Sequence, residues 1–264
     1  MADKFAKAAA YDVQMGRWSA RLAPLFAEFA QVRDDGRILD VGCGTGALVQ
    51  LLADVTQRSA IVGIDLSQPF IDCTRSRFTS PRFSFHVGNA MELPYPDASF
   101  DQSLSLLVLQ MLPQPNKAAK EMRRVTRSGG TIAACTWAHG EGGLEMNAIF
   151  WEEAIKLDPA AENEAERSRH CNRRGELTEL WQAAGLDAVE EVVLEIRTDF
   201  SSFDDYWLPY TGGTGSPGVY VDTLSPKRRE ALREALRTRL LGDAMDRPIT
   251  LRARGLAVRG TVPS

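Results

Sequence analysis

The sequence lacks the features that mark several classes of protein. Basic residues do not exceed acidic ones: 31 Lys and Arg stand against 35 Asp and Glu, a formal charge of −4 and a pI near 5.5. A nucleic-acid-binding surface is normally basic because it replaces phosphate counterions, so this balance argues against a nucleic-acid partner. Unbroken apolar runs, such as residues 106–109, stay far below the roughly 20 residues of a membrane-spanning helix. We therefore expect no membrane span.

Cysteine and histidine are also scarce, with four and three residues. The cysteines, Cys43, Cys73, Cys135 and Cys171, are widely spaced without a C-x-x-C pair, which predicts reduced thiols. No His/Cys cluster has ligand spacing, so no metal site is predicted. The first residues, "MADKFAK", mix charges and lack the apolar segment of a signal peptide, which favours a cytoplasmic location.

What is present is an alternation of short apolar runs with helical patterns. This rhythm predicts an α/β fold with a parallel sheet covered on both faces. The expected strands are residues 37–41, 61–65, 82–87, 100–106 and 131–137, and helices are expected to start near Gly46, Ser67 and Gln114. Gly129 and Gly130 are expected to form the turn into the fifth strand.

The flanking segments predict additions to this core. One helical face ahead of the first strand carries Trp18, Leu22, Leu25, Phe26 and Phe29. We assign residues 1–35 to an N-terminal helical lid, 36–140 to the core and 141–264 to the completion of the sheet. The last part is expected to hold helices over residues 146–157 and 176–184, with a polar linker between them. Its strands are expected near residues 188–198 and 249–260, with a cap insertion over 199–247.

The most informative segment is "ILDVGCGTGALVQLL", residues 38–52. Glycines after a strand let the backbone approach a ligand, and the N-terminus of the following helix offers free N–H groups. A dinucleotide fingerprint is G-x-G-x-x-G, in which two residues separate the second and third glycines. Here only one residue separates Gly44 from Gly46. Asp40, two residues before Gly42, would repel a pyrophosphate and suits a ligand with an ammonium or sulfonium group. These two features disfavour a nicotinamide dinucleotide.

Two later residues are consistent with an adenosine moiety. Asp65 ends the expected second strand, where a carboxylate can accept both ribose hydroxyls in either type of cofactor. After the third strand, Asn89 and the backbone of Ala90 and Met91 are suited to the adenine edge.

Five ordered blocks carry a family resemblance: "DVGCGTG", "GID", "GNAMELPYPDASFD", "LSLLVLQMLPQP" and "RSGGTIAACTW". Between Tyr11 and Trp137 the chain resembles the class I S-adenosylmethionine-dependent methyltransferases. Within them it is similar to the small-molecule branch that includes the ubiquinone and menaquinone C-methyltransferases. The resemblance implies a Rossmann-like, doubly wound sheet of seven strands with the last one antiparallel, and S-adenosylmethionine as the cofactor.

The resemblance also implies where the cofactor lies. Asp40 and the loop containing Gly42, Cys43, Gly44 and Gly46 would hold the methionine end, and Asp65, next to Leu66, the ribose. Asn89 stands where the family most often has aspartate. Gln110 replaces a histidine that is frequent in the family. The full set of implied cofactor-binding residues is Tyr11, Arg17, Asp40, Gly42, Cys43, Gly44, Gly46, Asp65, Leu66, Asn89, Ala90, Met91, Leu106 and Leu107.

Methyl transfer from a sulfonium is an in-line displacement that depends on alignment and on exclusion of water. A general base is required only for a protonated acceptor, and none stands out. The candidates for a catalytic residue or for contact with the substrate are His139, Tyr206 and Tyr210. The acceptor is expected to be a small molecule methylated at carbon, oxygen or nitrogen, and the chain a monomer or homodimer. Two alternatives stay open at this point: a non-catalytic cofactor-binding regulatory subunit and an NAD-type oxidoreductase.

Overall fold

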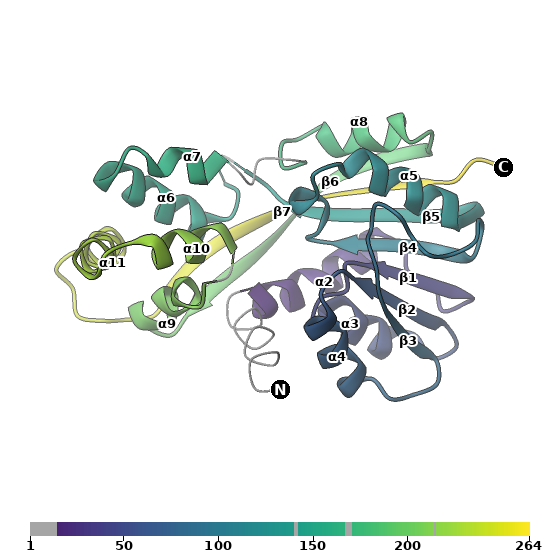
Figure 1. Cartoon of the computed structure of the whole chain (residues 1–264), viewed down its shortest axis with the longest axis horizontal. Helices are drawn as coiled ribbons and strands as arrows, with labels where there is room; N and C mark the ends of the chain where they lie inside the picture. The colour runs from purple at the N-terminus through teal and green to yellow at the C-terminus, as the bar shows by residue number, and fades with distance from the viewer. Residues whose placement is uncertain (1–14, 140–141, 167–170, 214) are drawn as a thin grey trace.

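The computed structural model describes residues 15–139, 142–166, 171–213 and 215–264. Its centre is a seven-stranded sheet in the order β3-β2-β1-β4-β5-β7-β6, in which β7 runs antiparallel to both neighbours (Figure 1). The strands are β1 (Arg37–Val41), β2 (Ala60–Asp65), β3 (Phe83–Val87), β4 (Phe100–Leu106), β5 (Thr126–Trp137), β6 (Asp187–Phe200) and β7 (Ile249–Thr261). The predicted fold class is confirmed, including the antiparallel last strand.

The strand β5 begins earlier than expected. Thr126 pairs with Phe100 of β4, and the Gly129 and Gly130 backbone groups bond to Val262 just after β7. The two glycines therefore lie within the strand rather than in a turn before it. Local sequence cannot show this, because the pairing partners lie far along the chain.

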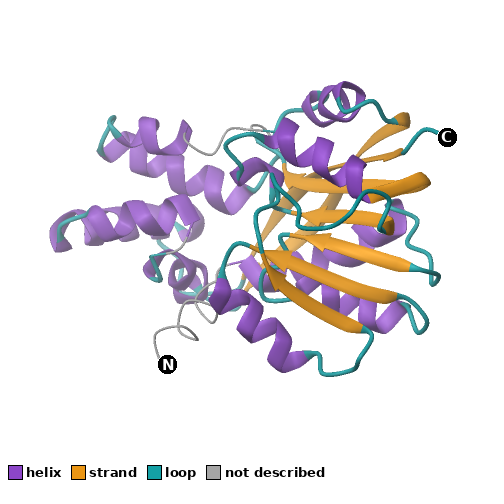
Figure 2. Cartoon of the chain, turned by 45° about the vertical axis from the view of Figure 1, so that its right-hand side comes forward, coloured by secondary structure: helices purple, strands orange, loops and turns teal. Residues whose placement is uncertain are grey.

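Helices cover both faces of the sheet (Figure 2). The helices α2 (Arg17–Phe29), α3 (Ala47–Val55) and α4 (Gln68–Arg77) share one apolar layer, and α5 (Pro115–Val125) and α8 (Glu176–Ala183) share the other. In α2, Trp18, Leu22 and Phe26 are buried as predicted, whereas Leu25 is 37% exposed. The described part of the N-terminal segment is thus packed into the core.

A group of helices lies beyond one end of the sheet, beside the extended ends of β6 and β7 (Figure 1). It comprises α6 (Glu145–Leu157), α7 (Ala161–Glu166), α9 (Phe203–Trp207), α10 (Gly215–Thr223) and α11 (Pro226–Leu241), with a 3-10 helix at Leu208–Thr211. We call this group the cap. The chain enters it twice, before β6 as well as between β6 and β7.

The segment expected as a polar linker contains α7. Ala161 and Ala165, four residues apart on this helix, are both buried, so one face of an otherwise acidic helix packs in the cap. Two alanines give too weak an apolar pattern to be noticed in the sequence. No helix in the described parts of the chain has the length and apolar character needed to cross a bilayer.

Candidate functional site

The glycine loop connects β1 to α3 at the carboxyl end of the sheet. Gly42, Gly44 and Gly46 all have positive φ, at 76°, 54° and 97°. A Cβ on Gly42 would lie 2.3 Å from Cγ2 of Val108, so this position has room only for glycine. The N–H groups of Gly42 and Cys43 both donate to the Ile64 carbonyl, at 2.7 and 3.0 Å, which ties the loop to β2.

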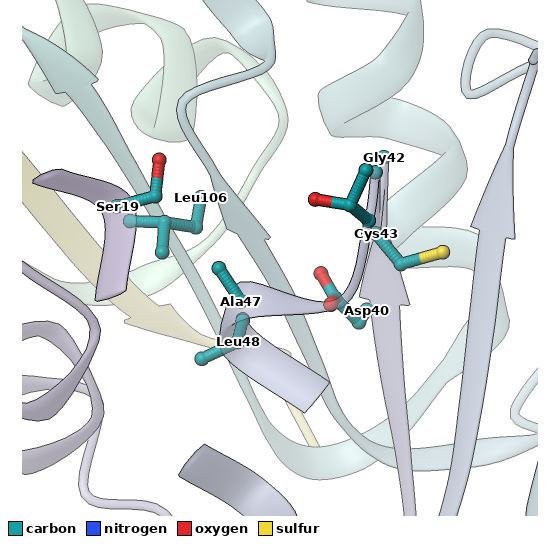
Figure 3. Close-up of a pocket in the computed structure, with 9 residues that line it drawn as sticks. Ser19, Asp40, Gly42, Cys43, Ala47, Leu48 and Leu106 are labelled. Atoms are coloured by element: carbon teal, nitrogen blue, oxygen red, sulfur yellow. The ribbon is translucent and has the colours of Figure 1, made fainter. Parts of the chain in front are cut away.

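A pocket opens above this loop (Figure 3). It is lined by Ser19, Asp40, Gly42, Cys43, Gly44, Thr45, Ala47, Leu48 and Leu106. The Cys43 thiol points away from its centre, and burial raises the pKa of that thiol, so Cys43 contributes backbone to the site and no nucleophile. Sequence reasoning missed Ser19, because it lies beside the apolar stripe of α2 and carries no motif.

Asp40 is the one charged residue in the lining of this pocket. Its side chain is 1% exposed, and its Oδ2 atom has no hydrogen-bond partner within the described structure. Burial, followed by the nearby charge of Asp65, raises the pKa of Asp40 to about 8. A buried acceptor without a donor is costly, and a bound cation removes that cost. The site is therefore suited to a ligand with a positive charge.

Asp65 lies at the end of β2, next to the glycine loop. Its Oδ2 accepts the Gly44 N–H at 2.9 Å and its Oδ1 accepts the Ser67 N–H at 2.8 Å. Burial raises the pKa of this carboxyl, and the two backbone bonds oppose the rise. The bonds fix the orientation of the carboxylate and leave lone pairs on both oxygens. Leu66, by contrast, is 74% exposed.

The loop after β3 begins beside Asp65. The Gly88 N–H donates to the Asp65 carbonyl at 3.0 Å, and Asn89 follows directly. Asn89 Oδ1 accepts the Met91 N–H at 2.9 Å, which fixes the orientation of its amide group. The sheet thus brings Asp40, Asp65 and Asn89, three of the polar residues singled out in the sequence, to neighbouring strand ends.

Comparison with known proteins identifies the family to which this chain belongs. A family model described as a methyltransferase domain matches residues 39–134. A phosphatidylethanolamine N-methyltransferase from Cereibacter sphaeroides is 30% identical over 173 residues, 58% of this chain and 83% of that protein. The chain belongs to the class I S-adenosylmethionine-dependent methyltransferases. Its cofactor is S-adenosylmethionine, and the NAD-type alternative is set aside.

Two further similarities agree with this assignment. A demethylmenaquinone methyltransferase from Roseiflexus castenholzii is 36% identical over 98 residues, 37% of this chain and 41% of that protein. A phosphoethanolamine N-methyltransferase 2 from Haemonchus contortus, solved in complex with S-adenosylmethionine, shares the fold with a TM-score of 0.61 and 17% identity, over 97% of this chain and 57% of that one.

The residues present fit S-adenosylmethionine. This methyltransferase has a buried carboxylate at Asp40 whose Oδ2 has no hydrogen-bond partner among the described residues, which is chemically suited to an ammonium group. It also has a glycine loop that a Cβ would obstruct and a carboxylate at Asp65 whose orientation suits vicinal hydroxyls. Among the described residues no group of three or more His, Cys, Asp or Glu side chains is arranged to hold a metal ion.

Arg17 is engaged with the cap rather than with the pocket. Its guanidinium pairs with Asp205 of α9 at 2.8 Å and stacks on the rings of Trp18 and Phe200. The contact between Arg17 and the methionine end stays a prediction, and it would require Arg17 to be shared with or released from Asp205. Tyr11 lies outside the described residues.

Other predicted residues lie at the ends of β4 and β5. Leu106 lines the pocket, whereas Leu107, with φ of 65°, is buried and donates its N–H to the Cys135 carbonyl. Gln110 Oε1 accepts the Trp137 N–H at 2.8 Å and so joins the two strand ends. His139 is exposed after β5, and its N–H donates to the Asn172 carbonyl.

Tyr206 and Tyr210 lie inside the cap. Both are fully buried, and both hydroxyls donate to the Met146 carbonyl, at 3.0 and 2.9 Å. Burial raises the pKa of Tyr206 and of Tyr210. With their hydroxyls engaged in this way, the two tyrosines anchor α9 and the 3-10 helix to α6 and have no access to a substrate.

Proposed function

We propose that this enzyme transfers a methyl group to a small-molecule acceptor by in-line displacement, at nitrogen, oxygen or carbon. The observation that carries the proposal is the buried Asp40 carboxyl beneath the glycine loop, whose Oδ2 has no hydrogen-bond partner among the described residues. The acidic balance of the chain supports a small molecule over nucleic acid. The relatives named for phosphatidylethanolamine and demethylmenaquinone methylation support the same choice.

Each polar residue at the strand ends has a role in this proposal. S-adenosylmethionine supplies an activated methyl carbon when it is bound. Asp40 neutralises the ammonium group of the methionine end, and the backbone of residues 42–46 packs against it. Asp65 accepts the ribose hydroxyls, and Asn89, with the backbone of Ala90 and Met91, contacts the adenine.

The cap and α2 exclude water in this proposal. The ion pair between Arg17 and Asp205 joins α2, which supplies Ser19 to the pocket, to the cap helix α9. Displacement at an activated carbon needs an aligned nucleophile in a dry site more than it needs a base. The absence of a proton-transfer pair among the described residues of the pocket is consistent with this chemistry.

The proposal is tested by binding and by turnover. We expect calorimetry to show binding of S-adenosylmethionine and of its demethylated product, and radiolabelled methyl transfer to at least one class in a panel of phenols, quinols and amines. Lack of binding of either compound would refute the cofactor site. Binding with no transfer to any class would contradict the proposed reaction.

Replacing Asp65 with alanine should weaken S-adenosylmethionine binding by roughly 1–3 kcal/mol, because charge-assisted hydrogen bonds to the ribose are lost. Calorimetry on folded protein measures the effect. Asp72→Ala in α4 removes a carboxylate that pairs with Gln68 and Arg75 of its own helix, and it serves as the control. Equal dissociation constants for wild type and Asp65→Ala would mean that the ribose is held elsewhere.

Replacing Asn89 with aspartate should strengthen cofactor binding by about 1 kcal/mol, or about fivefold. The aspartate oxygen can still accept the Met91 N–H, and a charged acceptor forms a stronger bond to the adenine amino group. Asn89→Ala, which removes the acceptor, should weaken binding. If both substitutions shift the affinity in the same direction, Asn89 does not contact the adenine.

A further inference from the structure

A second cavity lies within the cap, between α6, α10 and α11. Its volume is about 130 Å³. This is close to the roughly 150 Å³ of an apolar protein cavity that binds benzene. Its lining consists of Ala154, Leu157, Asp158, Tyr220, Leu224, Arg228, Ala231 and Leu232. None of these residues lines the glycine-loop pocket, so the two sites are separate.

Most of this lining is apolar. Ala154 and Leu232 are each 1% exposed and belong to the core, while Leu157 is 51% exposed although it lines the same cavity. The apolar surface therefore runs from the buried interior to the open mouth. Covering it with a hydrocarbon chain would remove this surface from water, which is favourable in proportion to the area covered.

The polar groups form an ion pair. Arg228 Nη1 contacts Asp158 Oδ2 at 3.0 Å, and Asp158 Oδ1 accepts the Ala160 N–H at 3.1 Å. Both oxygens of Asp158 are thus engaged, whereas the Arg228 side chain is 67% exposed and keeps N–H donors open to solvent. The neighbouring cation Arg229 lies outside the lining and pairs with Asp222 at 3.6 Å, so Arg228 is the basic residue of the cavity lining.

We propose that this cap cavity binds a free aliphatic carboxylate, with the hydrocarbon tail against Ala154 and Leu232 and the carboxylate on Arg228. The apolar lining matches the tail, and the open guanidinium matches the charge of the head group. This site is separate from the methyl-transfer site, and the aliphatic carboxylate is a second ligand of the chain.

The test uses the full chain and dodecanoate below its micelle concentration, which displaces a fluorescent fatty acid, cis-parinarate. We expect saturable displacement at one site per chain. Ala231→Phe places a ring into the mouth of the cavity and should weaken dodecanoate binding more than tenfold. The matched control is Ala235→Phe, one turn further along α11 and outside the lining, which should leave the affinity unchanged.

Two charge variants test the head group. Arg228→Gln should weaken dodecanoate binding about fivefold, the effect of losing one exposed charge pair. Asp158→Asn frees Arg228 from its partner and should strengthen binding. Dodecanol, which has the same tail without charge, should respond to neither change.

Several outcomes would overturn the proposal. These are equal dodecanoate affinity for Ala231→Phe and Ala235→Phe, shifts of the same sign for Arg228→Gln and Asp158→Asn, or binding to phosphatidylcholine vesicles without binding of free dodecanoate. S-adenosylmethionine affinity is measured in every variant and should not change. A chain that binds dodecanoate as expected but not S-adenosylmethionine would refute the proposed function and leave this inference standing.

Discussion

Replacing Asp40 with asparagine should strongly weaken cofactor binding and at the same time stabilise the cofactor-free protein at pH 8. The loss of binding follows because asparagine cannot neutralise the ammonium group in a buried pocket. We expect the dissociation constant for S-adenosylmethionine to rise at least about 100-fold, or about 3 kcal/mol, as for the loss of one member of a buried ion pair.

The gain in stability follows from the raised pKa. The pKa of Asp40 is about 8 in the folded protein, against 3.8 in the unfolded chain, because burial and then Asp65 disfavour the charged form. Between about pH 4 and pH 8 the folded protein holds a proton that the unfolded chain has lost. The free energy of unfolding therefore falls as pH rises through this interval, by up to about 1.4 kcal/mol per pH unit, and levels off above pH 8. Asparagine does not titrate, so Asp40→Asn removes this slope.

Urea unfolding of the wild type and of Asp40→Asn, without cofactor at pH 5 and pH 8, measures the free energy of unfolding of each protein. The difference in unfolding free energy between Asp40→Asn and wild type should favour the variant and be larger at pH 8. Asp72→Asn, in the more exposed α4 position, should follow wild type at both pH values. Parallel curves for Asp40→Asn and wild type would mean that Asp40 is ionised in the folded protein at pH 5, and that water or another group compensates its charge.

Replacing Gly42 with alanine should lower the free energy of unfolding by about 2–4 kcal/mol. Two costs add: a positive φ of 76° strains any residue with a Cβ, and the new methyl group would overlap both Cγ atoms of Val108, at 2.3 and 2.7 Å. S-adenosylmethionine binding should weaken as well, because relief of the overlap displaces the loop beside Asp40.

Gly129→Ala separates the two costs. Gly129 has a similar φ of 69°, but a Cβ there meets no atom within 4 Å, so only the backbone strain of about 1 kcal/mol applies. Urea unfolding of both variants at one pH measures the difference. Equal losses for Gly42→Ala and Gly129→Ala would show that Val108 moves aside without cost.

The core of the fold could be predicted because its signals are local. The five parallel strands are short apolar runs bounded by turn residues, and the glycine spacing near Asp40 disfavours a dinucleotide within fifteen residues of chain. Asp65 and Asn89 were found because each follows a strand, and parallel strands bring their carboxyl ends to one edge. These inferences need no knowledge of distant contacts.

The cap could not be predicted to the same degree. The apolar face of its helix α7 consists of two buried alanines, which is too short a pattern to recognise. The cap is also built from two separate stretches of chain, one before β6 and one after it. Arg17 and Tyr206 have side chains that could contact a ligand. Each instead forms a hydrogen bond with a residue more than 50 positions away, Asp205 and Met146 respectively. No local pattern reveals such a partner.

The sequence by itself determined the α/β alternation, a glycine loop unsuited to a dinucleotide and the polar residues at the strand ends, and through the family resemblance it indicated the cofactor. It did so because periodicity, glycine spacing and the sign of a single charge act over a few residues. Only the tertiary structure decided that Asp40 is buried with no hydrogen-bond partner for its Oδ2 in the described part of the chain. It also decided that the cap tyrosines are buried against Met146, and that a separate apolar cavity with an exposed arginine lies between α6, α10 and α11. Burial and pairing depend on which distant segments meet, and that is settled only when the whole chain packs.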